Sequence, residues 1–378
     1  MKLIKEIENM NLTKKLKKED IVKIKEKSKN DLYLISKYRT VIMGFASLLV
    51  LFFHTGMPVF DNLPMLYNIE KFIKITGYYG VDIFIFLSGI GVVYSIEKNN
   101  MREFYYKRVK RILIPFFITT IALAIYEKWT ILTFIRRVSF YDFFTKNIYS
   151  VLWFIPAIVT MYIIFPLYYK LFKHSKNKFS LTIIIISIIC ILLAFFSNNI
   201  RSDLFGFVIR IPVFLVGILF GWIIKNKQCK LNIWTYVTFF IALIMVLHLV
   251  YLINFKQFYI IEKTTNLFLP NIAIPVLISI VISKICDLTI RYNNFILKML
   301  TFFGTISLEL YCVQELLYKI IFKKYIITIP FIANMIILIA TTLCAMLLSV
   351  INKKFWKVFE NFIRKGSGKN ENNSTCFK

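Results

Sequence analysis

Residues 76–95 read TGYYGVDIFIFLSGIGVVYS, a run of twenty residues in which Asp82 carries the only formal charge. A helix of about 20 mostly apolar residues spans the hydrocarbon core of a bilayer. In hydrocarbon, every backbone N–H and C=O must find its partner within the segment, which favours a helix. The alternation of apolar and polar residues that a membrane β-barrel requires is absent. The stretch therefore predicts a transmembrane helix.

Nine further segments of this kind are distributed along the 378 residues. Hydrophobic residues make up 58% of the chain and charged residues 18%, whereas soluble domains are about one quarter charged. This composition excludes a disordered chain, a fibrous protein and an ordinary cytosolic enzyme. We predict an all-α, polytopic transmembrane bundle of about ten spanning helices, at residues 40–57, 76–95, 112–127, 151–169, 180–197, 206–224, 232–254, 267–283, 300–318 and 328–351.

The chain is strongly basic, with 48 Lys and Arg residues against 20 Asp and Glu residues and a formal net charge of +28. A soluble protein of this charge would suggest nucleic acid, but here the basic residues lie between the apolar runs, as in cytoplasmic loops. With both termini in the cytoplasm, 35 of them lie inside and 12 outside. We therefore predict cytoplasmic termini, a multi-pass protein of the plasma membrane in contact with the lipid bilayer, and no nucleic-acid partner.

Three parts are predicted along the chain. Residues 1–36 form a basic cytoplasmic segment, residues 37–352 the transmembrane domain, and residues 353–378 a basic cytoplasmic tail whose end, residues 366–378, is disordered. No cleavable signal peptide is recognisable in the charged residues 1–39, so the first span is expected to stay as an anchor. The six cysteines are scattered without metal-ligand spacing, and no metal is expected. Any chemistry then belongs to the bundle itself.

Ionisable side chains within spans are costly and are functional candidates. His54 ends the first span, near the outer face, while Arg39 lies 15 residues earlier, about 22 Å along a helix, at the cytoplasmic face. Asp82 lies near the outer end of the second span. Consecutive antiparallel helices can bring His54 and Asp82 together, and a His–carboxylate pair suits a general base.

The inner loop between the second and third spans is compactly basic. It reads MREFYYKRVKRILIP over residues 101–115. Arg108 and Arg111 share a face of a helix because they are three residues apart. Together with Lys107 they form a cluster that is typical of a phosphate site.

Further candidates lie deeper in the spans. Ser88 and Gly89 form a small pair that lets another helix, or an extended ligand chain, approach closely. Trp153 begins the fourth span, and Arg210 lies near the outer end of the sixth, where it pairs with an acid or holds a substrate group. Glu309 lies in the middle of the ninth span, so we expect an intramembrane arginine or a water-filled cavity beside it.

Each candidate also has a structural interpretation. His54 fits an interfacial histidine beside a turn, and Asp82 fits a helix cap. The basic loop follows from the positive-inside rule alone, Trp153 stands where interfacial tryptophans are common, and Arg210 can snorkel to the interface. The sequence leaves both interpretations open for these residues.

Several motifs in order resemble a known family. They are GVDIFIFLSG at 80–89, FYYKRVKRILIP at 104–115, LWFIPAIVTMYIIFPL at 152–167, RIPVFLVG at 210–217 and GTISLELY at 304–311. With the first span from Arg39 to His54, they resemble the acyltransferase family 3 integral-membrane proteins over residues 37–350. The resemblance implies transfer of acetyl or other acyl groups, mostly to sugars of cell-surface polysaccharides and peptidoglycan.

The resemblance also implies roles for individual residues. His54 matches a first-span histidine regarded as catalytic, and Arg39 resembles its arginine partner. The second-span motif is matched by Asp82, Phe84, Ser88 and Gly89, and the basic pair that faces acyl-coenzyme A by Arg108 and Arg111. Two departures are visible in the sequence. Fourteen residues separate Arg39 from His54, one helical turn more than is common, and Gln314 stands where the family often has a histidine.

These residues define the hypothesis of a membrane O-acyltransferase, most simply an O-acetyltransferase. Acyl-coenzyme A, such as acetyl-coenzyme A, binds from the cytoplasm through Arg39, Lys107, Arg108 and Arg111, and its arm passes Ser88 and Gly89. His54, oriented by Asp82, takes the acyl group or deprotonates the acceptor hydroxyl. The acceptor is a surface or lipid-linked glycan, and Trp153, Arg210 and Glu309 are assigned to it. The hypothesis requires a polar passage from Arg108 and Arg111 to His54.

Two alternatives and one further partner stay open. A transporter, flippase or polymerase of lipid-linked sugars would share the many spans and the basic cavity, but it would not bind acyl-coenzyme A. A scaffold that recruits glycan enzymes through residues 2–30 is the third interpretation. A separate extracytoplasmic transferase is left open as a partner that completes the transfer.

Overall fold

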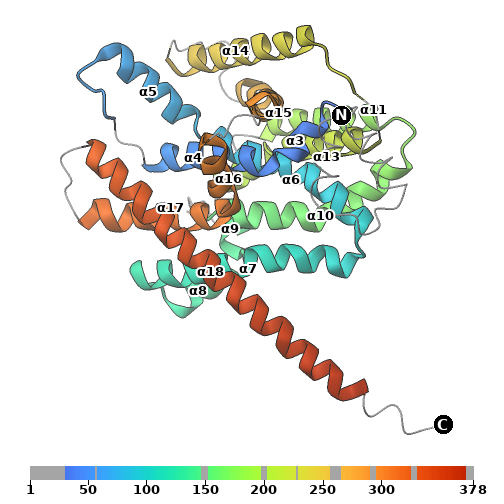
Figure 1. Ribbon diagram of the computed structural model, residues 1–378, viewed down its shortest axis with the longest axis vertical. Helices are drawn as coiled ribbons and strands as arrows, with labels where there is room; N and C mark the ends of the chain where they lie inside the picture. The colour runs from blue at the N-terminus through green and yellow to red at the C-terminus, as the bar shows by residue number, and fades with distance from the viewer. Residues whose placement is uncertain are drawn as a thin grey trace, which may run out of the picture.

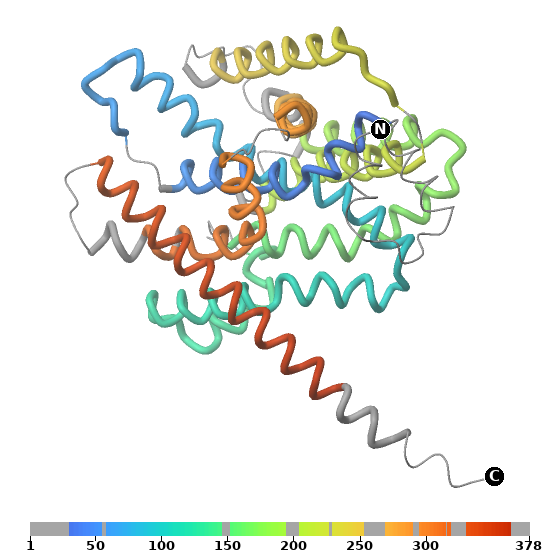
Figure 2. The backbone as a smooth tube through the Cα atoms, in the orientation of Figure 1, coloured from blue at the N-terminus to red at the C-terminus, as the bar shows by residue number. Residues whose placement is uncertain are grey.

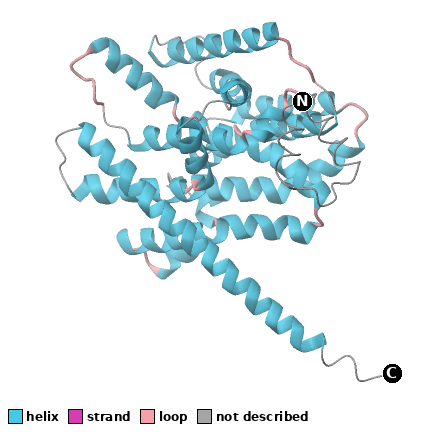
Figure 3. Cartoon of the chain, in the orientation of Figure 1, coloured by secondary structure: helices cyan, strands magenta, loops and turns pink. Residues whose placement is uncertain are grey.

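A computed structural model describes residues 30–55, 58–145, 152–196, 202–226, 229–255, 265–289, 295–324 and 330–371. Within these ranges every regular element is a helix (Figure 3), so the predicted all-α class is confirmed. The helices are α3 (Tyr33–Lys37), α4 (Arg39–Thr55), α5 (Pro64–Thr76), α6 (Tyr79–Lys98), α7 (Met101–Tyr126), α8 (Ile131–Val138), α9 (Tyr141–Thr145), α10 (Phe154–His174), α11 (Lys178–Phe196), α12 (Ser202–Val208), α13 (Ile211–Asn226), α14 (Ile233–Phe255), α15 (Thr265–Thr289), α16 (Phe295–Thr305), α17 (Ser307–Lys324) and α18 (Pro330–Glu371).

Seven helical segments in the described ranges are long and apolar enough to cross a membrane. They are Pro64–Lys98, Met101–Tyr126, Phe154–His174, Leu204–Asn226, Ile233–Leu252, Leu269–Thr289 and Pro330–Ile363. An eighth results if α16 and α17, which meet at 67°, count as one bent span. The first and fifth predicted spans fall on the shorter apolar helices Arg39–His54 and Lys178–Leu193. The total of ten spans and the cytoplasmic location of both termini stay predictions.

Helix α6 forms the centre of the bundle. From Tyr79 to Val93 almost all of its residues are buried, and it packs against α4, α13 and α15. Figures 1 and 2 show α10 and α7 in successive layers beyond this centre, with α14 at the opposite edge. Because α6 is covered on all sides, its polar residues must face other helices or an internal cavity.

The long helix α18 crosses the bundle and extends past the other helices at its C-terminal end (Figures 1 and 2). It continues without a break through residue 353, where the sequence predicted the start of the tail, as far as Glu371. The apolar residues Phe355 and Phe359 continue the four-residue spacing of a helix face past this point. The helix is described as far as Glu371, while residues 1–29 and 372–378 lie outside the described part, and the division of the chain into three parts stays a prediction.

Glycine permits the closest helix crossings. A Cβ atom on Gly44 of α4 would lie 1.8 Å from the carbonyl oxygen of Leu300 in α16. On Gly304 it would lie 1.9 Å from the carbonyl oxygen of Thr40. Backbones in membrane bundles approach this closely where small residues meet. This crossing fixes the N-terminal half of α4 against α16, next to the site described below.

We expect Gly44→Ala and Gly304→Ala to destabilise the bundle because the new methyl group collides with backbone that cannot rotate away. The cost of such overpacking is about 1–3 kcal/mol, and it is measured as a lower unfolding temperature of the protein in detergent. Gly206→Ala is the matched control, since its Cβ would meet no atom closer than 3.6 Å. Equal stability of all three variants would contradict the close crossing.

Candidate functional site

A cavity of about 570 Å³ lies between α4, α6, α7, α10, α16 and α17. Five of the six residues predicted to bind the acyl donor line it: Arg39, Ser88, Lys107, Arg108 and Arg111. The sixth, Gly89, faces α13 instead, where a Cβ atom would lie 2.4 Å from the carbonyl oxygen of Phe214. Of the two interpretations left open for Gly89, the structure supports close helix packing.

The cavity follows one face of α6. Its lining residues on that helix are Phe84, Ser88, Gly91, Val92 and Ser95, at the spacing of a single helical face. From Ser95 to Phe84 this face is about 16 Å long, at 1.5 Å per residue. The half-exposed side chains of Lys107 and Arg111 mark the open end, while Phe84 is buried and marks the deep end.

Arg39 extends from the start of α4 onto α6. Its guanidinium covers Gly91, where an added Cβ would lie 3.1 Å from one terminal nitrogen. The buried Nε of Arg39 has no hydrogen-bond partner, and among the described residues no carboxylate forms an ion pair with it. Its electrostatic neighbours are Tyr162 and a second arginine, Arg111. Arg39 is half-buried and lines the cavity, and a partly desolvated cation without a counter-ion is costly, so this side chain is suited to an anionic ligand.

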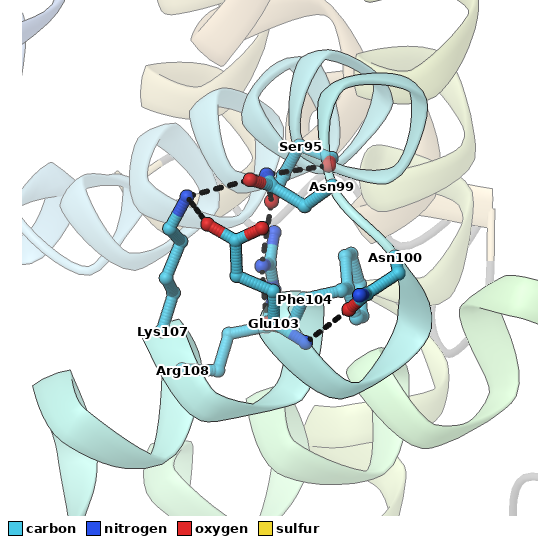
Figure 4. Close-up of polar contacts among 7 residues, drawn as sticks. All are labelled: Ser95, Asn99, Asn100, Glu103, Phe104, Lys107 and Arg108. Carbon is cyan, nitrogen blue, oxygen red and sulfur yellow. Dashed lines mark hydrogen bonds and ion pairs between the residues drawn. The ribbon is translucent and has the colours of Figure 1, made fainter. Parts of the chain in front are cut away.

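Arg108 is held rigidly in the wall of the cavity (Figure 4). Its Nη1 donates hydrogen bonds to Ser95 Oγ at 2.9 Å and to the carbonyl oxygen of Phe104 at 2.8 Å. The guanidinium carbon lies 3.6 Å from the centre of the Phe104 ring and 5.2 Å from that of Tyr162. Its buried Nε has no hydrogen-bond partner. Arg108 is thus oriented by two helices while part of its donor capacity stays unused.

The neighbouring turn fixes the mouth of the cavity. Asn100 caps α7 by accepting a hydrogen bond from the backbone N–H of Glu103 at 2.9 Å, as N-cap asparagines commonly do. Lys107, one turn later, bonds to Asn99 Oδ1 and to Glu103 Oε1, each at 2.7 Å (Figure 4). These contacts hold the ammonium group beside Arg108 at the surface.

Glu309 is fully buried and lies against the cluster. Its carboxylate is 3.3 Å from Arg111, which also donates to the carbonyl oxygen of Thr305 at 3.4 Å. The sequence led us to expect an intramembrane arginine or a water-filled cavity beside Glu309; the partner is instead Arg111 of the basic loop, which lies at the open end of the cavity. Glu309 does not itself line the cavity, whose described lining carries four basic side chains and no carboxylate. The cavity is therefore positively charged overall.

Asp82 and Arg210 form a buried ion pair beyond the deep end of the cavity. The distance from Arg210 Nε to Asp82 Oδ1 is 2.9 Å, and the two side chains are 8% and 0% exposed. Arg210 Nη1 donates to the carbonyl oxygen of Gly206 at 2.9 Å, and the guanidinium lies 4.9 Å from the centre of the Trp153 ring. Of the readings left open for Arg210, the structure supports pairing with an acid rather than snorkelling.

His54 ends α4 with its ring against Phe53, at 5.0 Å between ring centres. A Cβ atom on Gly77 would lie 2.8 Å from Phe53 Cβ. His54, the next residue after Phe53, is therefore near the level of Gly77, at the turn between α5 and α6. Asp82 is five residues further along, about 7.5 Å at helical rise. No hydrogen bond or ion pair joins His54 to Asp82 within the described ranges, and orientation of His54 by Asp82 stays a prediction.

His54 is not among the described residues that line this cavity, so the passage expected from the arginines to His54 stays a prediction. Three aromatic residues close the deep end: Phe84, Phe154 and Tyr311. Phe84 follows Gly77, at the turn before α6, by seven residues, which corresponds to about 10 Å at helical rise.

Sequence reasoning missed several residues of this site. Tyr162 and Tyr311 line the cavity and Ser95 orients Arg108, but none was a candidate. In an apolar run such residues look like ordinary core or interfacial side chains. One signal was available in the sequence: Phe154, Ile158 and Tyr162 recur every fourth residue, and all three face the cavity.

Comparison with known families identifies the class of protein. Residues 41–351 match the family described as "Acyltransferase domain", and the chain belongs to this family, the acyltransferase family 3 that its motifs resemble. No curated protein and no solved structure matches the chain. A helical membrane bundle with this membership is a membrane acyltransferase.

We expect Asp82→Asn to destabilise the protein by about 3–5 kcal/mol, because it leaves the Arg210 guanidinium buried without a counter-ion. The double variant Asp82→Leu/Arg210→Met removes both charges and should recover most of that loss. Unfolding of the purified protein in detergent measures both effects.

The exposed pair of Lys107 and Glu103 provides the control, and Glu103→Gln should cost about 0.3–0.5 kcal/mol. If Asp82→Asn cost no more than this control, the ion pair with Arg210 would not be an important contact.

Proposed function

We propose that this acyltransferase takes an acyl group, in the simplest case acetyl, from cytoplasmic acyl-coenzyme A. It passes the group to a hydroxyl of a surface or lipid-linked glycan at the outer face of the plasma membrane. The observation that supports this most strongly is the cavity with four basic side chains and no carboxylate in its described lining. Such a site favours a ligand that carries several phosphate groups.

The dimensions of the cavity fit the donor. Lys107, Arg108 and Arg111 at the mouth would hold the phosphates, and Arg39 would hold a further anionic or carbonyl oxygen. The pantetheine arm is roughly 20 Å long by chain-length estimate. It would lie along the cavity face of α6, which is about 16 Å long at helical rise, and would pass Ser88. The thioester would then reach Phe84, at the deep end.

His54 is assigned to the transfer step. As a general base it takes the proton of the acceptor hydroxyl while that oxygen attacks the thioester carbonyl. The C–S bond breaks, and the coenzyme A thiolate takes up a proton. As a nucleophile, His54 instead attacks the thioester carbonyl and expels the coenzyme A thiolate to form an acyl-imidazole. The acceptor hydroxyl then attacks this carbonyl, the C–N bond breaks, and the hydroxyl proton is released to the imidazole. Either route needs the deep end of the cavity to open, since about 10 Å separates Phe84 from the level of His54.

The acceptor side is assigned to Trp153, beside the buried pair of Asp82 and Arg210. Because the Arg210 guanidinium is paired with Asp82, it offers no free charge to a substrate. It contacts the face of the Trp153 ring instead and positions that ring. Glu309 lies against Arg111 and is better assigned to holding the donor cluster than to the acceptor. An additional extracytoplasmic transferase stays open as a partner.

Family membership does not favour the alternative of a transporter, flippase or polymerase without acyl chemistry. The scaffold alternative depends on residues 2–30, which, apart from Asn30, lie outside the described part of the chain. The transferase reaction is therefore the function to be tested first.

The donor site predicts that Arg39→Gln weakens acyl-coenzyme A binding about ten- to a hundred-fold, because a hydrogen bond from a charged group contributes about 1.5–3 kcal/mol. Calorimetry with the full chain in lipid nanodiscs measures the affinity. Lys110→Gln is the control: it lies on the same helix, pairs with Glu360 and is not among the described residues that line the cavity, so it should leave the affinity nearly unchanged. Unchanged binding by Arg39→Gln would remove Arg39 from the donor site.

For the transfer step, we expect His54→Ala to lower acyl transfer at least about a hundred-fold, the usual contribution of an acid–base group. Donor binding should stay unchanged because His54 lies outside the cavity. The readout is the O-acetyl content of surface glycans in cells that produce the variant. His174→Ala, at the exposed end of α10, is the control with full activity, and turnover of His54→Ala near that of wild type would refute its central role.

A further inference from the structure

The deep end of the donor cavity is closed by aromatic side chains from three helices. Phe84 comes from α6, Phe154 from α10 and Tyr311 from α17. The ring centres of Phe84 and Phe154 are 6.3 Å apart, and those of Phe154 and Tyr311 are 5.2 Å apart. All three are less than one tenth exposed. We call these residues the aromatic wall.

The wall is held in place by more than packing. The backbone N–H of Phe154 donates a hydrogen bond to Tyr311 Oη at 3.1 Å. This N–H is at the first turn of α10, where helical N–H groups lack an internal partner. The bond therefore ties the start of α10 to the middle of α17. A ligand that displaced the Tyr311 ring would leave the buried N–H of Phe154 without its hydrogen-bond partner, which costs free energy.

The position of the wall sets what the cavity can hold. A thioester at the end of the pantetheine arm would lie directly against Phe84, because the arm and the α6 face are of similar length. An acetyl group ends there. A longer acyl chain would have to displace aromatic rings that are fixed from three helices, and overpacking of a rigid site is unfavourable.

We propose that Phe84, Phe154 and Tyr311 set the length of the acyl group, so that the enzyme accepts short acyl chains and excludes long ones. The inference rests on the proposed function, because it assumes that acyl-coenzyme A occupies the cavity. It assigns a specificity role to three residues that otherwise look like core aromatics.

The aromatic wall lies between two regions that contain charged side chains. On one side lie the four basic residues of the cavity, and on the other lie Asp82, two residues before Phe84, and Trp153, next to Phe154. The rings of Trp153 and Phe154 are 6.5 Å apart between centres. A layer of aromatic rings between two charged regions acts as a partition.

The test compares affinities of acetyl-, butyryl- and octanoyl-coenzyme A for the full chain in nanodiscs. Wild type should prefer acetyl- over octanoyl-coenzyme A by about ten-fold or more, the scale of discrimination that a few methylenes give. Phe84→Ala should reduce this preference at least about ten-fold, and Phe84→Leu should give an intermediate value. Phe154→Ala should act in the same direction as Phe84→Ala.

Phe86→Ala is the matched control. Phe86 is on the same helix, two residues away and fully buried, but its ring lies against Phe220 of α13, with ring centres 5.4 Å apart. It should lower stability without changing the preference between acyl chains. The leucine variant keeps the test decisive if the alanine variants fail to fold, because it retains most of the buried volume.

The outcomes separate the two levels of the argument. If wild type binds none of the three thioesters, the proposed function fails. If it binds all three equally, or if Phe84→Leu and Phe84→Ala keep the wild-type preference, the aromatic wall has no role in chain length while the proposed function stands. A parallel change in Phe86→Ala would also overturn the inference, since it would reflect general loosening of α6.

Discussion

Buried guanidinium groups are the constraint on which this structure depends. A charge within a membrane bundle is costly unless something compensates it. Arg210 is compensated within the chain by Asp82 at 2.9 Å, by a carbonyl oxygen and by the Trp153 ring. Arg39 and Arg108 have no such carboxylate among the described residues, and each keeps a buried Nε without a partner. The first arrangement is a complete ion pair, whereas the second keeps donor groups available, as the proposed anionic donor would require.

The centre of the fold makes this incomplete cluster accessible. Helix α6 presents two different faces: Gly89 meets α13 at backbone distance, while Ser88, one residue earlier, faces the cavity. Adjacent residues on a helix point about 100° apart, so one sequence motif serves both purposes. The tight contact on the Gly89 side lets the bundle close around α6. The face with Ser88 is left free for a ligand.

The sequence predicted the fold class and a basic cluster, because both depend on local composition. It predicted an arginine or a water-filled cavity beside Glu309 from the cost of a lone buried charge, but it did not identify Arg111. It did not predict that Asp82 pairs with Arg210. Helical periodicity gives the face of each residue but not which helices are neighbours, nor how far one is shifted along another. The bend between α16 and α17 and the shortness of α4 follow from tertiary packing in the same way. The sequence did not predict the aromatic wall, because Phe154 and Tyr311 lie in runs of other apolar residues.

The separation of His54 from the donor cavity has a physical rationale. The proposed transfer from a cytoplasmic donor to an outer acceptor would have to connect two aqueous sides without leaving a continuous water path between them. Apolar constrictions in membrane proteins block water and ions by dewetting, and the rings of Phe84, Phe154 and Tyr311 stand where the passage would otherwise be open. A closed wall when the donor chamber is empty, opened only as the acyl group moves toward His54, would reconcile transfer across the membrane with an intact barrier.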